Sequence, residues 1–389
     1  MIDDIQLMNI LNQMLSYCKN EDWAGYDPFD GLNSLMMRNS PLFYLSICRL
    51  FWIQLFKRNP VNLRPMFLVP KGRNPKGIAL FASGFLRLYK VTGNSKYLLE
   101  AKKLLKWLNE NYSKGYAGFA WGYNFPWQSR NDYKKAFLPT IVTTSFVAMS
   151  FLDGYKITEN KEYLDVALSS VEFVLKNLNI YNANDTIAFS YGPADFARVY
   201  NATALGSAFL ARLYFYTREE RYLQMAKKAM NYVVKHQNND GSWYYGASRK
   251  QKWIDNFHTG YNLISLKKYE EYIGNLSFHE NLMNGYEFYK KELFTKEGYP
   301  KYYHNSFYPI DIHSCAVSIL VFLEFGDIER AEKVLNWTIE KMWNKEGYFN
   351  YQITRFYKNT IPYMRWSQAW MFYAMTAYLS KTKSRGQRA

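Results

Sequence analysis

The feature that most constrains the fold of this chain is an internal repeat. In each full copy, a Tyr-Leu pair is followed by Ala four residues after the Tyr, and then by an aromatic residue six positions after the Ala. The full copies start 66 and 59 residues apart. This period is longer than that of helical solenoids and indicates helix hairpins that close into a ring. The copies, the last of them weaker, run from Tyr97 to Trp107, Tyr163 to Phe173, Tyr222 to Tyr232 and Ala331 to Trp337.

Six segments are apolar on nearly all sides, which is typical of buried helices. We expect them to form the inner wall of the ring. They cover residues 76–91, 139–156, 200–216, 257–270, 311–325 and 364–380.

Between these segments lie helical patterns with one polar face, which are expected to form the outer layer. The segment 40–57 is expected to be the sixth outer helix, and a helix and loop over 1–33 to complete the closure. The sequence therefore predicts a single all-α domain, an (α/α)6 toroid over residues 1–382, followed by a disordered tail at 383–389. The other outer helices are expected at 96–112, 161–177, 219–236, 278–292 and 327–343.

The connections from each outer helix to the next inner helix carry Gly turns with aromatic residues, a pattern that indicates short strand pieces. Because these loops all precede inner helices, they are expected on one face of the ring, which is therefore the candidate active face. The loops cover 115–123, 189–192, 241–245, 298–303 and 347–351.

Composition indicates the kind of partner. Aromatic residues make up 19% of the chain, with 35 Tyr and 11 Trp, and such flat side chains suit the apolar faces of sugar rings. The net charge of +16 favours an anionic partner. The lysines are scattered and no nucleic-acid-binding motif is found, so an acidic glycan is expected rather than nucleic acid. The tryptophans expected to stack on sugars are Trp121, Trp127, Trp243 and Trp366.

Other features concern location and cofactors. Asp3 and Asp4 stand where a signal peptide would be basic, so a cytoplasmic location is expected. The apolar segment 39–56, interrupted by Arg49, is expected to be a buried helix, and a membrane-surface helix is the alternative. Peripheral contact with a membrane-bound assembly complex is left open. The three cysteines form no disulfide framework, and no metal or cofactor is expected.

Polar residues stand where the inner helices begin, and two histidines are among them. His258 follows Asp255 by three residues, and His313 follows Asp311 by two. Histidine exchanges protons near neutral pH, so these two pairs, together with Tyr261, are the candidate catalytic groups. A zinc site built from His258, His313 and Asp255 is a less favoured alternative.

Two chemistries fit these residues. One is proton abstraction beside a sugar carboxylate, as in epimerases and lyases, in which basic and amide groups would hold the anion. The other is glycoside hydrolysis by two of Asp195, Asp255 and Asp311. A non-catalytic glycan-binding scaffold is a third alternative. The residues expected to bind substrate, besides the tryptophans, are Arg365, Asn256, Tyr200, Arg198 and Asp195.

The chain resembles the six-hairpin α/α-toroid carbohydrate-active enzymes over about residues 20–382. Within that group it is similar to polysaccharide-biosynthesis proteins and, distantly, to the C-terminal domain of glucuronyl C5-epimerases. The resemblance implies the toroid fold and a polysaccharide or its precursor as substrate, and it transfers no catalytic residue. Together with the basic charge balance, it leads us to expect an acidic polysaccharide or its precursor. It is carried by YDPFDGLN (26–33), NPKGIA (74–79), WIDNFHTGY (253–261) and RWSQ (365–368).

Overall fold

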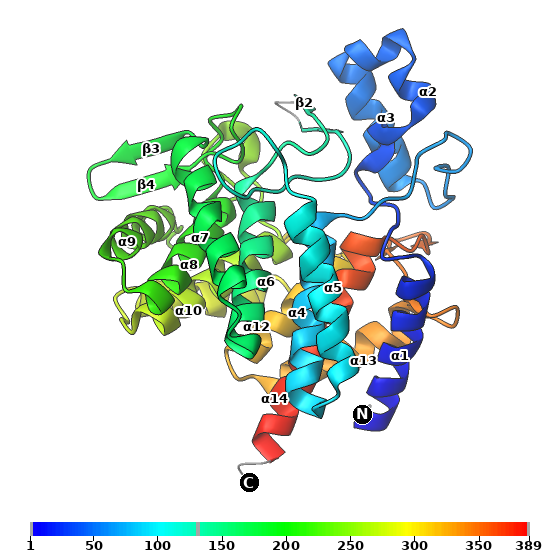
Figure 1. Ribbon diagram of the computed structural model, residues 1–389. Helices are drawn as coiled ribbons and strands as arrows, with labels where there is room; N and C mark the ends of the chain where they lie inside the picture. Colours follow the sequence, from blue (N-terminus) through cyan, green and yellow to red (C-terminus); the bar gives the residue numbers. More distant parts are fainter. Residues whose placement is uncertain (1–2, 130–132, 387–389) are drawn as a thin grey trace.

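The computed structural model describes residues 3–129 and 133–386, and its side chains to residue 383. Its centre is a closed ring of six inner helices, each packed against the next, with the last packed against the first (Figure 1). The predicted all-α toroid is thereby confirmed. The inner helices are α4 (Pro75–Thr92), α6 (Ile141–Thr158), α8 (Tyr200–Thr217), α10 (Asn256–Ile273), α12 (Ile312–Glu324) and α14 (Trp370–Gly386).

An outer helix packs against each of the first five inner helices, as the repeat predicts. These outer helices are amphipathic, and their small and apolar residues are buried while their Lys and Glu residues face solvent. They are α5 (Ser95–Glu110), α7 (Lys161–Lys176), α9 (Glu220–Lys235), α11 (His279–Glu292) and α13 (Ile328–Met342).

The helix that packs on the outside of α14 is α1 (Asp4–Asn20), so the prediction that 40–57 is the sixth outer helix is wrong. α1 buries Leu7, Leu11 and Met14, which lie on one face at helical spacing. By contrast, α3 (Ser46–Arg58) buries only Ile53 and Phe56, too little to seal one side of the ring.

The ring closes tightly because glycines allow neighbouring inner helices to approach. A Cβ atom on Gly84 of α4 would lie 2.5 Å from a ring carbon of Phe372 in α14. A Cβ atom on Gly260 of α10 would lie 2.4 Å from Val317 in α12. Both positions therefore require glycine unless the packed helices move apart.

The starts of the inner helices are fixed by polar caps. The side chains of Asn74, Thr140, Asp255 and Asp311 each accept a hydrogen bond from a backbone N–H in the first turn. α14 is preceded by a π-helical turn, Met364–Ala369. α14 itself continues to Gly386, into the expected disordered tail, and residues 387–389 lie outside the described part of the chain.

The loops that precede the inner helices contain the expected short strands, all paired antiparallel. Three pairs form two-stranded sheets and the remaining strands form a three-stranded sheet. The strands are β1 (Trp127–Gln128) with β2 (Tyr133–Lys134), β3 (Ile180–Ala183) with β4 (Thr186–Phe189), β6 (Trp343–Asn344) with β7 (Tyr348–Phe349), and β5 (Ile310–Asp311) with β8 (Gln352–Ile353) and β9 (Lys358–Asn359).

At the same end of the molecule, a small helical unit projects beside the ring (Figure 1). It consists of η1 (Asp30–Asn33), α2 (Leu35–Arg38), η2 (Pro41–Tyr44) and α3. Leu32, Met37 and Ile53 form its own core, separate from that of the ring. Among the described residues, no helix is long and apolar enough to span a membrane.

Candidate functional site

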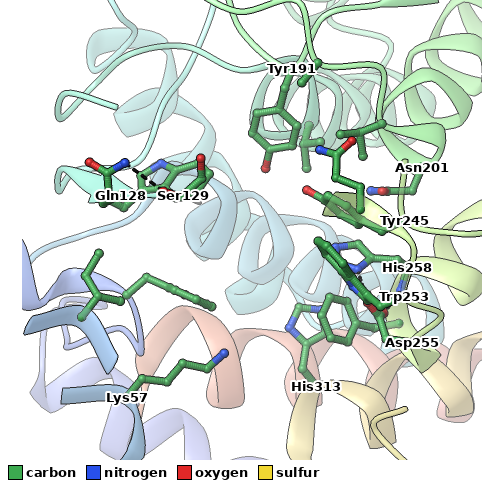
Figure 2. Close-up of a pocket in the computed structure, with 18 of the residues that line it drawn as sticks. Lys57, Gln128, Ser129, Tyr191, Asn201, Tyr245, Trp253, Asp255, His258 and His313 are labelled. Carbon is green, nitrogen blue, oxygen red and sulfur yellow. Dashed lines mark hydrogen bonds and ion pairs between the residues drawn. The ribbon is translucent and has the colours of Figure 1, made fainter. Parts of the chain in front are cut away.

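A cavity of about 750 Å³ opens where the inner helices begin. Every inner helix, or the turn that leads into it, supplies a side chain to its wall, so the site depends on the closed ring. Figure 2 shows Lys57 and Gln128 on one side, across the cavity from Trp253 and His258. One lining residue from each successive inner helix or its preceding turn is Lys76, Val142, Asn201, His258, His313 and Trp366.

The Asp255 carboxylate orients the His258 imidazole. One carboxylate oxygen accepts the backbone N–H of His258 at 2.9 Å, and the other lies 2.6 Å from His258 Nδ1. That second oxygen also accepts the indole N–H of Trp253 at 2.9 Å. Because the carboxylate accepts a hydrogen bond from Nδ1, the neutral form of the ring carries its proton on Nδ1 and its lone pair on Nε2. His258 thus has the geometry of a general base.

A second proton-exchanging pair lies deeper in the cavity. Tyr261 Oη and His313 Nε2 are 2.6 Å apart, and within the described chain His313 Nδ1 has no hydrogen-bond partner. Burial, together with the nearby Lys76 and Arg365 charges, holds the pKa of His313 well below its usual range. Burial also raises the pKa of Tyr261 well above its usual value. Both groups are therefore neutral at neutral pH and share a hydrogen bond that either of them can donate.

Lys76 is a site residue that the candidate set did not include. Its Nζ lies 3.4 Å from Tyr261 Oη and above the rings of Phe146 and Trp370, at 4.1 and 5.1 Å from their centroids. Burial and the Arg365 charge hold the pKa of Lys76 well below its usual range. The sequence feature that could have identified Lys76 is its position, a lysine in the first turn of an otherwise apolar helix.

Arg365 lies in the cavity wall with its charge already compensated. Asp27 accepts two hydrogen bonds from its guanidinium, at 2.6 and 2.8 Å, and both side chains are buried. The guanidinium stacks over the Tyr123 ring, 4.6 Å from its centroid. Arg365 is thus a fixed donor held at the base of the pocket by a residue of the N-terminal loop.

Asp311 lies behind the cavity and does not line it. Its carboxylate accepts the indole N–H of Trp366, the amide of Gln352 and the backbone N–H of His313, each at 2.9 Å. Burial raises the pKa of Asp311 to about 6. This residue positions His313 and Trp366, and the expected direct role beside His313 does not fit its placement.

Asp195 lines the cavity in an ion pair with Lys134, at 2.6 Å. Its other carboxylate oxygen accepts the backbone N–H groups of Tyr191 and Ala197, at 3.0 and 3.1 Å. These bonds hold the loop that leads into α8.

Five expected substrate-binding residues do not line the cavity. Trp121 and Trp243 are buried in the core, where their indole N–H groups donate to the carbonyls of Leu108 and Val233. These two tryptophans lie between an outer helix and the following loop, so they have no face for a sugar. The other three residues contact neighbouring side chains instead: Asn256 bonds Tyr289 and Ser318, Tyr200 packs on Tyr232 and His236, and Arg198 lies over Tyr181.

The expected Trp127 and Trp366 do line the cavity. Several further aromatic residues of the same loops join them, and sequence reasoning recognised their loops without singling them out. They are Tyr123, Tyr191, Tyr245, Trp253, Tyr302 and Tyr303.

The cavity wall is strongly basic. Seven lysine and arginine residues line it, against the two carboxylates of Asp195 and Asp255. Such an excess attracts an anionic ligand into the cavity. Across the described residues, no three His, Cys, Asp or Glu side chains are grouped as metal ligands, so the zinc alternative has no support there. The cationic residues are Lys57, Lys76, Lys134, Arg249, Lys250, Lys252 and Arg365.

The fold is shared with solved structures of low sequence identity. A cellobiose 2-epimerase from Bacillus thermoamylovorans matches with a TM-score of 0.64 at 12% identity, over 82% of this chain and 90% of that one. A sugar epimerase from a ruminal bacterium matches with a TM-score of 0.62 at 14% identity, over the same shares of the two chains. A GH76 α-mannanase from Bacteroides thetaiotaomicron matches with a TM-score of 0.60 at 14% identity, over 81% of this chain and 87% of that one.

At these identities the likeness establishes the toroid fold alone. No protein-family model matches the chain, and no curated protein matches it in sequence. None of the three structures is a glucuronyl C5-epimerase, so that part of the predicted resemblance stays a prediction.

Proposed function

We propose that this protein is a carbohydrate-active enzyme that moves a proton at a sugar carbon beside a carboxylate or carbonyl, as epimerases and lyases do. The observation that carries the proposal is the pairing of two histidines in one basic cavity. Asp255 orients His258 through Nδ1, which makes Nε2 the proton-accepting nitrogen of the neutral ring, and the neutral His313–Tyr261 pair can donate or accept a proton. The substrate we propose is an acidic glycan, such as one that contains a uronic acid.

His258 acts as the base in this proposal. Its Nε2 takes the proton from carbon, and Asp255 stabilises the imidazolium that forms. The electron pair left on carbon delocalises into the adjoining carboxylate or carbonyl, where cationic groups stabilise the negative charge. Lys76 and Arg365 are the basic groups nearest to the inner end of the cavity, since both contact the aromatic residues of its floor, and both can donate hydrogen bonds to that charge.

Tyr261 and His313 supply the second proton. Tyr261 donates its hydroxyl proton to the carbon, and hydrogen bonds from His313 Nε2–H at 2.6 Å and Lys76 Nζ at 3.4 Å stabilise the tyrosinate that forms. Exchange with water then returns a proton to Tyr261 and takes one from the His258 imidazolium, so that both groups are reset. Return of the proton to the other face of the carbon gives epimerisation, and loss of a leaving group instead gives elimination.

Similar structures support sugar chemistry of this type on the fold. They include two sugar epimerases and a D-mannose isomerase. The basic wall of the cavity favours an acidic sugar over a neutral one as the substrate.

The test is incorporation of solvent deuterium into uronic-acid oligosaccharides, read by mass spectrometry and NMR. We expect label at a carbon-bound position with the wild-type protein and none with His258→Ala. Cellobiose and mannose serve as neutral comparisons. Label that enters equally with His258→Ala would remove His258 from the reaction, and label in the neutral sugars alone would remove the acidic substrate.

Lys57 offers a test of the charge alone. It lines the cavity, packs over the Phe29 ring at 4.6 Å, and has no carboxylate within ion-pair distance among the described residues. Lys57→Gln should raise KM for an acidic substrate about tenfold, as expected for the loss of one charge contact of about 1.4 kcal/mol. The melting temperature should not change. An unchanged KM would show that the acidic group of the substrate does not contact Lys57.

Hydrolysis is the second candidate, because α-mannanases share the fold. The two carboxylates of the cavity wall are both engaged, Asp195 by Lys134 and Asp255 by His258. One similar α-1,6-mannanase was made inactive by replacing two consecutive aspartates, whereas this chain has consecutive aspartates only at Asp3 and Asp4, where α1 begins. New reducing ends without deuterium incorporation would nevertheless favour hydrolysis. The open cavity argues against a purely structural scaffold.

A further inference from the structure

Exposed apolar side chains are concentrated in residues 35–68, which we call the basic apolar segment. It holds 10 of the 22 large apolar residues that are exposed in the described chain, although it is only 34 residues long. Patches of this kind mark interaction surfaces, because a free soluble surface rarely keeps them together. The ten residues are Leu35, Met36, Leu42, Tyr44, Leu45, Ile47, Phe51, Val61, Met66 and Leu68.

The segment projects from the ring instead of sealing it (Figure 1). Ile47 and Phe51 are separated by one turn of α3, so they share a face of the helix, and they are 75% and 67% exposed. The opposite side of α3 buries Ile53 and Phe56. Ile47 and Phe51 therefore do not contribute to the internal core of the small helical unit.

Charge in this region has one sign. Residues 31–99 contain eleven Lys and Arg and no Asp or Glu, and five of the cations fall in the basic apolar segment. Only Arg64 among those five is buried against a carboxylate, that of Asp30. In the described chain, no carboxylate lies within ion-pair distance of the other four, Arg38, Arg49, Lys57 and Arg58.

We propose that the basic apolar segment docks on the surface of an anionic lipid bilayer. Apolar side chains that enter the acyl boundary, beside cations that stay at the headgroups, are the combination that interfacial binding requires. The absence of acidic residues over 31–99 means that no charge in the segment opposes an anionic surface. Since no described helix can span the bilayer, the contact lies in the interface.

Docking would also bring the cavity to the bilayer. Leu50, Gln54 and Lys57 of α3 line the cavity, so its mouth adjoins the docking segment. An anionic saccharide carried on a lipid is then the substrate class that fits both features. That substrate class rests on the proposed function, whereas docking itself does not.

The experiment is co-sedimentation of the full chain with vesicles, which requires no turnover. Vesicles of equal parts phosphatidylcholine and phosphatidylglycerol should bind the protein, and vesicles of phosphatidylcholine alone should bind it much less. Binding should weaken with added salt. The double variant Ile47→Ser with Phe51→Ser should bind the anionic vesicles at least about tenfold more weakly, because two large apolar side chains no longer enter the membrane.

The matched control replaces two equally exposed apolar residues outside the segment, Ile5→Ser with Leu276→Ser, which are 75% and 65% exposed. This control should bind like the wild type, and both double variants should keep the wild-type melting temperature. Equal binding by the two double variants, or no binding to anionic vesicles, overturns the proposal. So does a wild-type dimer that the Ile47→Ser, Phe51→Ser variant converts to a monomer, since a second copy would then cover the segment.

Discussion

Asp255 and His258 are joined by two hydrogen bonds, one to the backbone and one to the ring of the histidine, at 2.9 and 2.6 Å. Asp255 thus caps α10 and orients His258 with the same carboxylate. The start of the helix and the direction of the imidazole are set together, which places Nε2 toward the cavity.

Asp255→Asn tests this coupling. An asparagine can still cap the helix, but its amide can present an N–H to His258 Nδ1 and so favour the wrong tautomer. We expect kcat for the proposed proton transfer to fall about 10²- to 10⁴-fold, with a small change in KM. Asp195→Asn, which changes the other cavity carboxylate, is the comparison and should retain far more activity. A larger loss from Asp195→Asn would instead favour hydrolysis.

Tyr261→Phe tests the second proton-exchanging pair. The change removes the hydroxyl that contacts His313 Nε2 and keeps the aromatic ring, so the loss of stability should be about 1–3 kcal/mol, the cost of leaving a buried polar atom without a partner. The rate of deuterium exchange should fall about 100-fold or more. Tyr302→Phe changes another cavity tyrosine and should have a small effect. Similar losses from both variants would show that the cavity tyrosines act through packing.

The fold was predictable because its signal is local and repeated. Inner helices are apolar on all sides and outer helices are amphipathic, so their order follows from the sequence. The helix that closes the ring was harder to predict from the sequence, because α1 and α3 both have apolar faces. Only the amount that each buries distinguishes the helix that packs on α14 from the one that projects.

The site was partly predictable for the same reason. The Asp255–His258 pair is encoded within one helix turn, and the sequence located it. The contact between Lys76 and Tyr261 joins residues 185 positions apart, and the Asp27–Arg365 pair joins residues 338 apart. No local pattern reports such contacts. Nor does a pattern of tryptophans distinguish Trp127, in the cavity, from Trp121, in the core.

Asp27→Asn tests the long-range pair that connects the N-terminal loop to the base of the cavity. The variant leaves the buried Arg365 charge without its carboxylate, which typically costs about 3–5 kcal/mol. Asp22→Asn is the matched control, because Asp22 pairs with Arg73 at the surface and the loss there should be at most about 1 kcal/mol. Denaturant unfolding of both variants measures the difference. Equal losses would mean that the Asp27–Arg365 pair adds nothing beyond a surface contact.

The raised pKa of Asp311 predicts a pH dependence of stability. Burial raises this pKa from the usual 3.8 to about 6. Between these values the folded chain keeps a proton that the unfolded chain has released, so the free energy of unfolding falls as pH rises through this window. Asp311→Asn cannot titrate. Its stability relative to the wild type should therefore increase between about pH 4 and about pH 7, whatever constant cost the lost contacts add.

Asp185→Asn provides a control that should show little pH dependence in this window. A hydrogen bond from Lys235 lowers the pKa of Asp185, so the stability that its ionised form contributes is nearly complete above the usual pKa of 3.8 and is lost only as pH falls below it. Between about pH 4 and about pH 7 this variant should keep a nearly constant stability relative to the wild type, whereas Asp311→Asn should become more stable. Urea unfolding of the wild type, Asp311→Asn and Asp185→Asn at about pH 4 and at about pH 7 measures these differences in stability. If Asp311→Asn keeps a constant offset from the wild type, Asp311 is ionised throughout, and its hydrogen bonds with Trp366 and Gln352 outweigh its burial.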